Sequence, residues 1–187
     1  MKKLQLFLKL TLTPMLVLLI CLPCFAYKVG GVDLVKNGAG SRTKYMMKVY
    51  WATLYVPEEL KGAKDTEIIN ADKAMAIDIR ITSGMVTRER FVESLTEAFD
   101  QSAKAGYPSQ DKQRYINLFN DITMAEGDTI SHRYDPANGL RIIFIPKGGQ
   151  SRTLGTLPGL QTKKAFFGIF LSSSPIQASL KRNLLGQ

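Results

Sequence analysis

The residue most clearly suited to binding chemistry in this chain of 187 residues is an arginine that follows two glycines. The segment Gly38-Ala39-Gly40-Ser41-Arg42 leads into an apolar run that ends at Val56. A guanidinium keeps its charge in proteins and presents five donors in a planar fork, so it suits a carboxylate or a phenolate. Arg42, at the mouth of an apolar strand, is therefore predicted to hold an anionic oxygen, although most arginines are solvated surface residues.

Residue types that could support catalysis or metal binding are otherwise sparse. His132 is the only histidine, and one histidine without partners forms neither a metal site nor a Ser-His-Asp triad. Gly38 and Gly40 lack the third glycine and the following helix of a phosphate-binding loop. The acidic residues are scattered along the chain. The sequence predicts no metal and no cofactor, and it argues against phosphotransfer and metal-dependent hydrolysis.

Residues 1–26 have the pattern of a secretory signal peptide. Two lysines lie near the start, Leu10 to Leu22 is mostly apolar, and Cys24-Phe25-Ala26 offers small residues at the two positions that a signal peptidase reads. The apolar stretch is interrupted and falls short of the roughly 20 residues of a membrane span. We expect cleavage after Ala26, a single mature domain over residues 27–187, a periplasmic or secreted location, and membrane contact only during export.

A lipoprotein is the alternative to soluble export, because two cysteines lie near the predicted cut. Ile20 and Pro23 precede Cys21 and Cys24, however, at positions where a small residue is expected. Both cysteines are predicted to leave with the signal peptide, so the mature protein would have neither a disulfide nor a thiol nucleophile.

The charge balance limits the class of partner. Loss of the three lysines of the signal peptide lowers the formal net charge from +9 to +6. Such a surface suits an anionic ligand or a membrane face. No basic run is interleaved with aromatic residues, so we expect no nucleic-acid partner.

Hydrophobic periodicity predicts an antiparallel sheet. The run from Met46 to Val56 is largely apolar on both faces, which is typical of a central strand. The run from Ala74 to Thr82 alternates between apolar and polar side chains, as a half-buried strand does. Further strands are predicted at 29–35, interrupted by a turn at Gly30-Gly31, at 127–135 and 139–146, joined by a tight hairpin at Asn138-Gly139, and within 148–159.

Helices are predicted between and after these strands. Four are expected: one from a cap at Thr87 to Gly106, one opened by Ser109, an apolar one over 160–171, and a last one from a cap at Ser174 to Gly186. The helix over 160–171 is apolar on nearly all sides, so it is expected to lie deep, as core or as pocket wall. The predicted fold class is α+β, a large antiparallel sheet covered by helices on one face.

Four blocks of the chain, in the same order, resemble the chalcone isomerase superfamily, and specifically its exported bacterial chalcone isomerase-like proteins. The first glycine-led block is similar to the Gly-Ala-Gly-x-Arg of plant chalcone isomerases. The others are a strand at 48–56, a hairpin from Gly127-Asp128 through Asp135-Pro136 to Gly139-Leu140, similar to the family's glycine-led hairpin with Pro-x-Gly in its turn, and Leu180-Lys181-Arg182-Asn183-Leu184, similar to the family's closing Leu-Lys-x-x-Leu helix.

This resemblance implies an open-faced β-sandwich with a ligand cleft between the sheet and the helices. In that family the arginine anchors the phenolate of a chalcone in the enzymes and the carboxylate of a fatty acid in non-catalytic plastid members. Arg42 is retained here. The enzymes' other polar positions are changed: the threonine of the first strand matches Tyr50, the tyrosine and lysine of the long helix match Thr87 and Arg90, the asparagine matches Ser94, and the specificity threonine matches Ile169.

The loss of these groups predicts binding without catalysis, because addition of a phenolate to an enone needs positioned water and donors. The resemblance implies a small hydrophobic carboxylate or phenolic ligand anchored by Arg42, with Tyr50 and Arg90 as helpers and with Ile169 and Phe170 in an apolar wall. One alternative is an isomerase or intramolecular lyase with Arg42 as electrophile and Tyr50 or Tyr115 as donor. Another is a structural, partner-binding protein whose cleft is filled by its own side chains.

Overall fold

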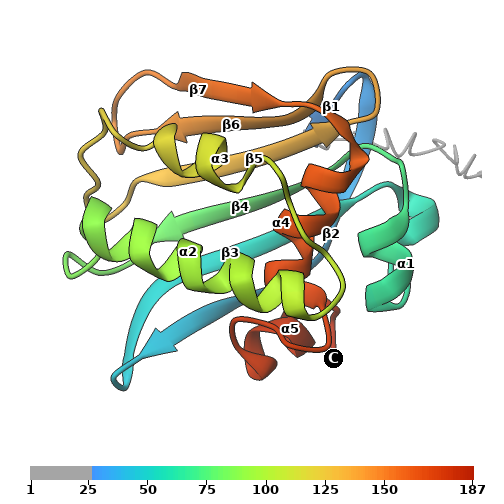
Figure 1. Ribbon diagram of the computed structural model, residues 1–187, viewed down its shortest axis with the longest axis horizontal. Coiled ribbons are helices and arrows are strands. Elements are labelled where there is room, and N and C mark those ends of the chain that lie inside the picture. Colours follow the sequence, from blue (N-terminus) through green and yellow to red (C-terminus); the bar gives the residue numbers. More distant parts are fainter. Residues whose placement is uncertain (1–26) are drawn as a thin grey trace, which may run out of the picture.

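The computed structural model describes residues 27–187, and the predicted signal peptide lies outside this range. Seven antiparallel strands form one sheet in which spatial order equals chain order (Figure 1). The strands are β1 (Tyr27–Val29), β2 (Val32–Lys44), β3 (Met47–Val56), β4 (Met75–Ile81), β5 (Thr129–Asp135), β6 (Gly139–Ile145) and β7 (Arg152–Leu157). Turns or short loops join β1 to β2, β2 to β3, β5 to β6 and β6 to β7, whereas the connections from β3 to β4 and from β4 to β5 carry helices.

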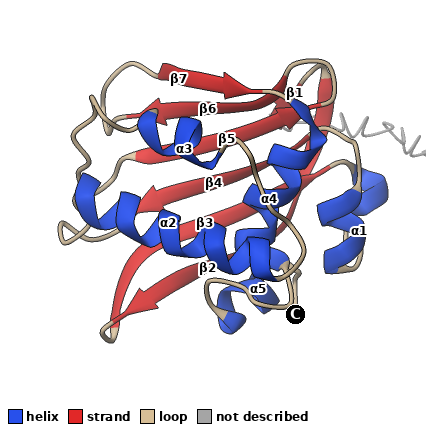
Figure 2. Ribbon diagram, viewed as in Figure 1, coloured by secondary structure: helices blue, strands red, loops and turns tan. Residues whose placement is uncertain are grey.

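Helices cover one face of this sheet (Figure 2). They are the 3₁₀ helix η1 (Glu58–Leu60), α1 (Asp65–Asn70), α2 (Arg88–Lys104), α3 (Lys112–Asn117), α4 (Gly159–Leu171) and α5 (Ala178–Leu184). The predicted α+β class, an open-faced sandwich with helices on one face of a large antiparallel sheet, is confirmed. Between residues 27 and 187, no helix combines the length and the apolar character that crossing a bilayer requires.

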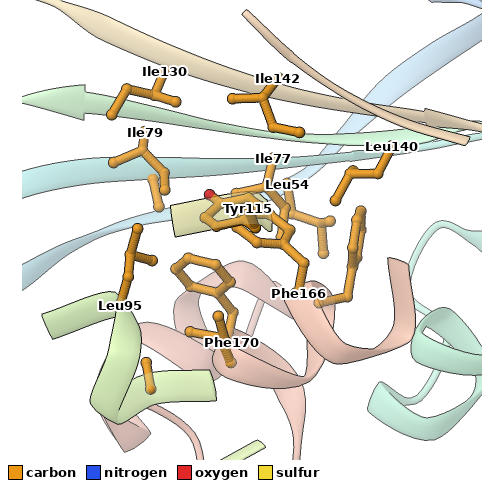
Figure 3. Packing of buried hydrophobic residues seen from close by; sticks show 14 of the residues in the cluster. Leu54, Ile77, Ile79, Leu95, Tyr115, Ile130, Leu140, Ile142, Phe166 and Phe170 are labelled. Atoms are coloured by element: carbon orange, nitrogen blue, oxygen red, sulfur yellow. The ribbon is translucent and has the colours of Figure 1, made fainter. Parts of the chain in front are cut away.

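The core lies between the sheet and α4. Every second side chain on each strand faces the helices, as Ile77 and Ile79 do on β4. Phe166 and Phe170 of α4 meet edge to face with ring centroids 5.5 Å apart, and Tyr115 lies beside them (Figure 3). Each fully buried apolar side chain stabilises the fold by about 1.5–3 kcal/mol relative to exposure.

The β5–β6 hairpin forms where it was predicted, but its turn is longer. Asp135 pairs with Gly139, so three residues make the loop, and only Gly139 takes a positive φ, of 87°. The Asp135 carboxylate accepts from the backbone N–H of Ala137 at 3.1 Å and of Asn138 at 2.9 Å. These local hydrogen bonds fix the turn, because an aspartate can satisfy backbone donors two and three residues ahead of it.

Two helix starts differ from prediction. The Ser109 hydroxyl accepts from the N–H of Asp111 in a turn, and α3 begins only at Lys112. Ser174 is not the cap of α5, which begins at Ala178 with Gln177 before it. The Gln177 side chain instead accepts from the N–H of Thr43 on β2 at 2.9 Å. A contact with a distant strand thus replaces the local capping pattern.

The C-terminal helix closes the structure over β2. A Cβ built on Gly38 would lie 2.2 Å from the Asn183 carbonyl oxygen, and one on Gly40 would lie 2.7 Å from the Asn183 Cβ. The two glycines are therefore required by the close approach of α5.

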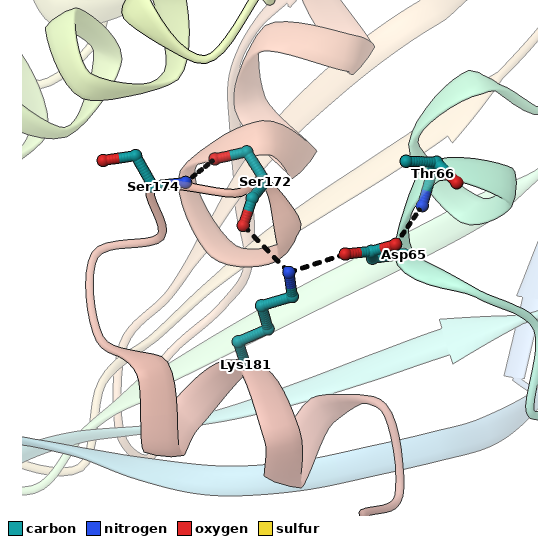
Figure 4. Close-up of polar contacts among 5 residues, drawn as sticks. All are labelled: Asp65, Thr66, Ser172, Ser174 and Lys181. Atoms are coloured by element: carbon teal, nitrogen blue, oxygen red, sulfur yellow. Dashed lines mark hydrogen bonds and ion pairs between the residues drawn. The ribbon is translucent and has the colours of Figure 1, made fainter.

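Lys181 connects α5 to the other helices. Its Nζ donates to Asp65 Oδ2 at 2.6 Å and to the Ser172 carbonyl oxygen at 3.0 Å (Figure 4).

Candidate ligand-binding pocket

A pocket of about 250 Å³ lies between the end of the β2–β3 hairpin and the first turns of α2. Arg42 and Lys44 from β2, Val49 and Tyr50 from β3, and residues of the β4–α2 loop and α2 line it. Its position, between the sheet and a helix, agrees with the cleft that the resemblance implied.

The strand alternation of β2 places Arg42 in this pocket. Gly38, Gly40 and Arg42 are two residues apart, so they share one face of the strand. Helix α5 covers the glycines. Arg42 lies beyond that cover, and its Nη1 donates to the Ser94 hydroxyl of α2 at 2.8 Å. The expectation that Arg42 lies at the mouth of the strand ending at Val56 is wrong, because Arg42 belongs to the neighbouring strand and pairs with Tyr50.

The electrostatics of the pocket favour an anion. Among the described residues Arg42 forms no salt bridge, and its hydrogen-bond partner, Ser94, is neutral. Lys44 and Arg90 add two further cations to the lining, and Glu93 is the acidic residue among them. A partly buried guanidinium without a carboxylate beside it retains donors for an external anion.

Tyr50 forms the apolar floor next to Arg42. The Arg42 Cζ lies 5.9 Å from the centroid of the Tyr50 ring, and Tyr50 is buried. Burial raises the pKa of Tyr50 above its ordinary value, while the positive charge of Arg42 acts in the opposite direction. At neutral pH the phenol is therefore protonated, and its O–H can serve as a donor.

Four of the seven residues predicted for the site line this pocket: Arg42, Tyr50, Arg90 and Ser94. The other three were predicted for it but lie elsewhere: Thr87, Ile169 and Phe170. The Thr87 hydroxyl accepts from the N–H of Arg90 at 3.3 Å and caps α2. Ile169 and Phe170 are each 1% exposed in the core, because α4 is enclosed on nearly all sides.

Tyr115, the second donor considered for an isomerase, also lies away from the pocket. Its hydroxyl is 2.5 Å from His132 Nε2, and both residues are buried. Burial lowers the pKa of His132 to about 3, so the imidazole is neutral at physiological pH. Among the residues from 27 to 187, His132 Nδ1 has no hydrogen-bond partner. The pair is a buried polar contact within an aromatic cluster that includes Phe166.

Sequence reasoning missed most of the rim of the pocket. Tyr45 lies in the β2–β3 turn, and Met85 and Val86 lie in the β4–α2 loop. These segments meet only in three dimensions, and no periodic pattern marks them. The charge of Lys44 was visible in the sequence, but its direction was not. Within the described part of the chain, no three His, Cys, Asp or Glu side chains converge to hold a metal ion.

Comparisons with known proteins agree with this architecture. A fatty-acid-binding protein from Arabidopsis thaliana has a similar crystal structure, with a TM-score of 0.60 and 17% sequence identity, covering 81% of this chain and 86% of that chain. At this identity the likeness shows the fold. The comparison with curated proteins gave no significant match. The family model described as chalcone isomerase-like matches residues 24–186. Because this match spans the whole sheet and its covering helices, the chain belongs to the chalcone isomerase-like family.

Proposed function

We propose that this protein is an exported, non-catalytic member of its family that binds a fatty-acid-like or other small hydrophobic anion through Arg42. The observation that carries the proposal is a guanidinium that lines an apolar pocket and forms no salt bridge with the described residues. Similarity in fold to a fatty-acid-binding protein supports the same ligand class. The signal-peptide pattern of residues 1–26 supports export.

The size of the pocket bears on the ligand. Its volume of about 250 Å³ lies just below the roughly 300–1,000 Å³ typical of small-molecule sites. A carboxylate at Arg42 would leave room for a short or medium apolar chain, and a longer chain would emerge at the rim beside Tyr45 and Met85. In this proposal the protonated Tyr50 hydroxyl donates a second hydrogen bond to the same carboxylate.

The test is isothermal titration of the protein with decanoate. A charge-assisted contact to a carboxylate contributes about 1.5–3 kcal/mol, so Arg42→Ala should weaken binding at least tenfold. Arg42→Lys should restore little of it, because a point charge on a flexible stem cannot form the planar bidentate contact. Thermal stability should change little in either variant, since Arg42 is only partly buried.

Arg141→Ala is the matched control for Arg42→Ala, because it removes the same charge from an exposed position on β6. It should bind decanoate as the wild type does. Equal binding by wild type and Arg42→Ala, or no binding by either, would contradict the proposed anchor. Extraction of the purified protein followed by mass spectrometry should identify a copurifying acid.

The absence of catalysis is tested by mixing the protein with common chalcones. We expect no flavanone above the spontaneous rate, because Arg42 has Tyr50 and Ser94 beside it in place of the enzymes' donors, and Tyr115 is bound to His132 in the core. Turnover that disappears in Arg42→Ala would instead support the alternative of an isomerase or intramolecular lyase.

A further inference from the structure

Large apolar side chains are exposed at the mouth of the pocket. Tyr45 is 80% exposed, Met46 97%, Met47 41% and Met85 40%. The first three follow one another at the tip of the β2–β3 hairpin, which projects at the lower left of Figure 1. Tyr45 and Met85 also line the pocket. Exposed apolar residues are ordinary when scattered singly, whereas a cluster beside a pocket marks an interaction site.

Two bulky residues at this tip adopt a strained backbone conformation. Lys44 pairs with Met47, so Tyr45 and Met46 form a two-residue turn. Their φ angles are 51° and 64°, and such a turn is usually occupied by Asn-Gly because both residues need a positive φ. Bulky residues in this conformation persist where function requires them. The tip therefore keeps a tyrosine and a methionine at a cost to the stability of the hairpin.

The charges on the β2–β3 hairpin around the tip are all positive. No acidic residue occurs between Leu34 and Pro57, and Lys44 and Lys48 flank the apolar residues on both sides. From helix α2, Arg90 and Glu93 line the pocket, and Arg88 and Glu89 precede them in the first turn. Arg88 and Glu89 pair with each other at 3.1 Å. The remaining Glu93 is outnumbered by Arg42, Lys44 and Arg90 in the lining of the pocket.

An aromatic residue and methionines between lysines suit the boundary between water and an anionic lipid layer. Apolar side chains enter the headgroup region, and lysines beside them are attracted to acidic headgroups. Tyrosine is favoured at this depth because its ring is apolar and its hydroxyl remains wet.

We propose that the tip, residues 44–48 together with Met85, docks on the surface of an anionic lipid bilayer with the mouth of the pocket facing the lipid. Docking depends only on this surface. Passage of an acid between the bilayer and Arg42, along the rim formed by Tyr45 and Met85, rests in addition on the proposed function.

The test is sedimentation of the protein with vesicles of phosphatidylethanolamine and phosphatidylglycerol. Met46→Ser with Met47→Ser should lower the partition coefficient at least tenfold, because both exposed apolar side chains are lost. The pocket should be unaffected, because neither residue lines it. Val32→Ser, an exposed apolar residue at the other end of β2, should bind as the wild type does. All proteins must share one N-terminus, checked by intact mass, so that residues 1–26 cannot account for a difference.

The electrostatic part of the proposal has its own measurement. Lys48→Gln should weaken binding to these vesicles. Addition of 0.5 M sodium chloride should weaken wild-type binding more than Lys48→Gln does, because salt screens every charge on the tip. Vesicles of phosphatidylcholine alone should bind poorly in every case. A Trp51→Phe background with Met46→Trp should give a blue-shifted emission on the anionic vesicles, because the new indole would enter the headgroup region.

Three outcomes would overturn the proposal. The first is a wild type that binds anionic and zwitterionic vesicles equally weakly. The second is a Met46→Ser, Met47→Ser variant that binds as the wild type does. The third is self-association in analytical ultracentrifugation that the same variant abolishes, with no vesicle binding, which would make the tip a contact between copies. Titration of the variant with decanoate separates the two proposals, since its pocket should bind as in the wild type.

Discussion

Lys163 is a titratable residue buried in the core of the protein, and it takes part in no salt bridge among the described residues. Its Nζ donates to the carbonyl oxygens of Ile68 at 2.6 Å, Ile69 at 2.9 Å and Ala71 at 2.9 Å. These carbonyls belong to the end of α1 and the residues after it, where a helix leaves acceptors unsatisfied. Three acceptors match the three donors of an ammonium, so Lys163 caps α1 from within α4.

The stability of the protein should depend on pH through Lys163. Burial lowers the pKa of Lys163 in the native state to about 7, whereas in the unfolded chain it is about 10.4. Between these values the unfolded chain binds more protons than the native one, so the contribution of Lys163 to the free energy of unfolding rises with pH. We expect wild type to gain stability relative to Lys163→Met as the pH increases from 7 to 9.5, measured by urea unfolding.

The difference between wild type and Lys163→Met isolates this group from the other titrating residues. A difference that stays constant across the same pH range would mean that the three carbonyls hold native Lys163 at its ordinary pKa. At every pH the variant should still be less stable by about 1–3 kcal/mol for each carbonyl left without a donor or water.

At the scale of elements, the packing of α5 on β2 explains the two glycines that precede Arg42. A Cβ on Gly38 would lie 2.2 Å from the Asn183 carbonyl oxygen and 2.5 Å from that of Leu184. Both atoms are backbone, so the helix or the strand must shift. We expect Gly38→Ala to lower the free energy of unfolding by about 1–3 kcal/mol, as overpacking does.

Gly84→Ala is the control for Gly38→Ala, because its Cβ would meet nothing within 4 Å. In urea unfolding, Gly84→Ala should have nearly the wild-type free energy of unfolding, whereas Gly38→Ala should show most of the predicted loss. Equal stability of the two variants would show that α5 moves aside at little cost, and that the glycines are not needed for its approach.

Elements with local signals could be predicted from the sequence, and those fixed by distant contacts could not. Thr87 caps α2 as expected, because a cap and its helix are neighbours in the chain. Ser174 looked like a cap for α5, but that helix begins at Ala178, and the Gln177 side chain before it accepts from the N–H of Thr43 on β2. No sequence pattern reveals a hydrogen bond between residues so far apart.

The same distinction applies to the candidate site. Arg42 and Ser94 could be placed together through resemblance to a family, and the structure joins them at 2.8 Å. Ile169 and Phe170 could not be assigned to wall or core, because a helix that is apolar on all sides has no face that periodicity can single out. The exposed rim at Tyr45 and Met85 comes from a turn and a loop, whose meeting depends on the whole sheet.

At the scale of the whole molecule, the predicted cleavage after Ala26 makes Tyr27 the first residue of the mature chain. The Tyr27 hydroxyl donates to Asp78 Oδ1 at 2.8 Å and lies 2.9 Å from Ser131 Oγ, and its ring stacks on Tyr55 with centroids 4.3 Å apart. A cut two or three residues later would remove this anchor together with most of β1.

We expect intact-mass analysis of protein from the cell envelope to give an N-terminus at Tyr27. Retention of residues 1–26 would contradict the predicted signal peptide. A lipid-modified cysteine at position 21 or 24 would support the lipoprotein alternative. A variant with Tyr27→Ser should be processed in the same way but should be less stable, because Asp78 would lose a donor on the outer face of the sheet.

The placement of the last helix over one of the first strands also determines when the protein can fold. Every strand pairs with its neighbour in the chain, so most of the sheet can assemble as synthesis proceeds. The glycine face of β2 lies against Asn183 and Leu184 of α5. A polypeptide synthesised only as far as α4 therefore lacks the helix that covers its first long hairpin, and this part of the native state forms only after α5 has left the ribosome. In the proposed export, such a delay would leave the chain incompletely folded while it passes through a translocation channel.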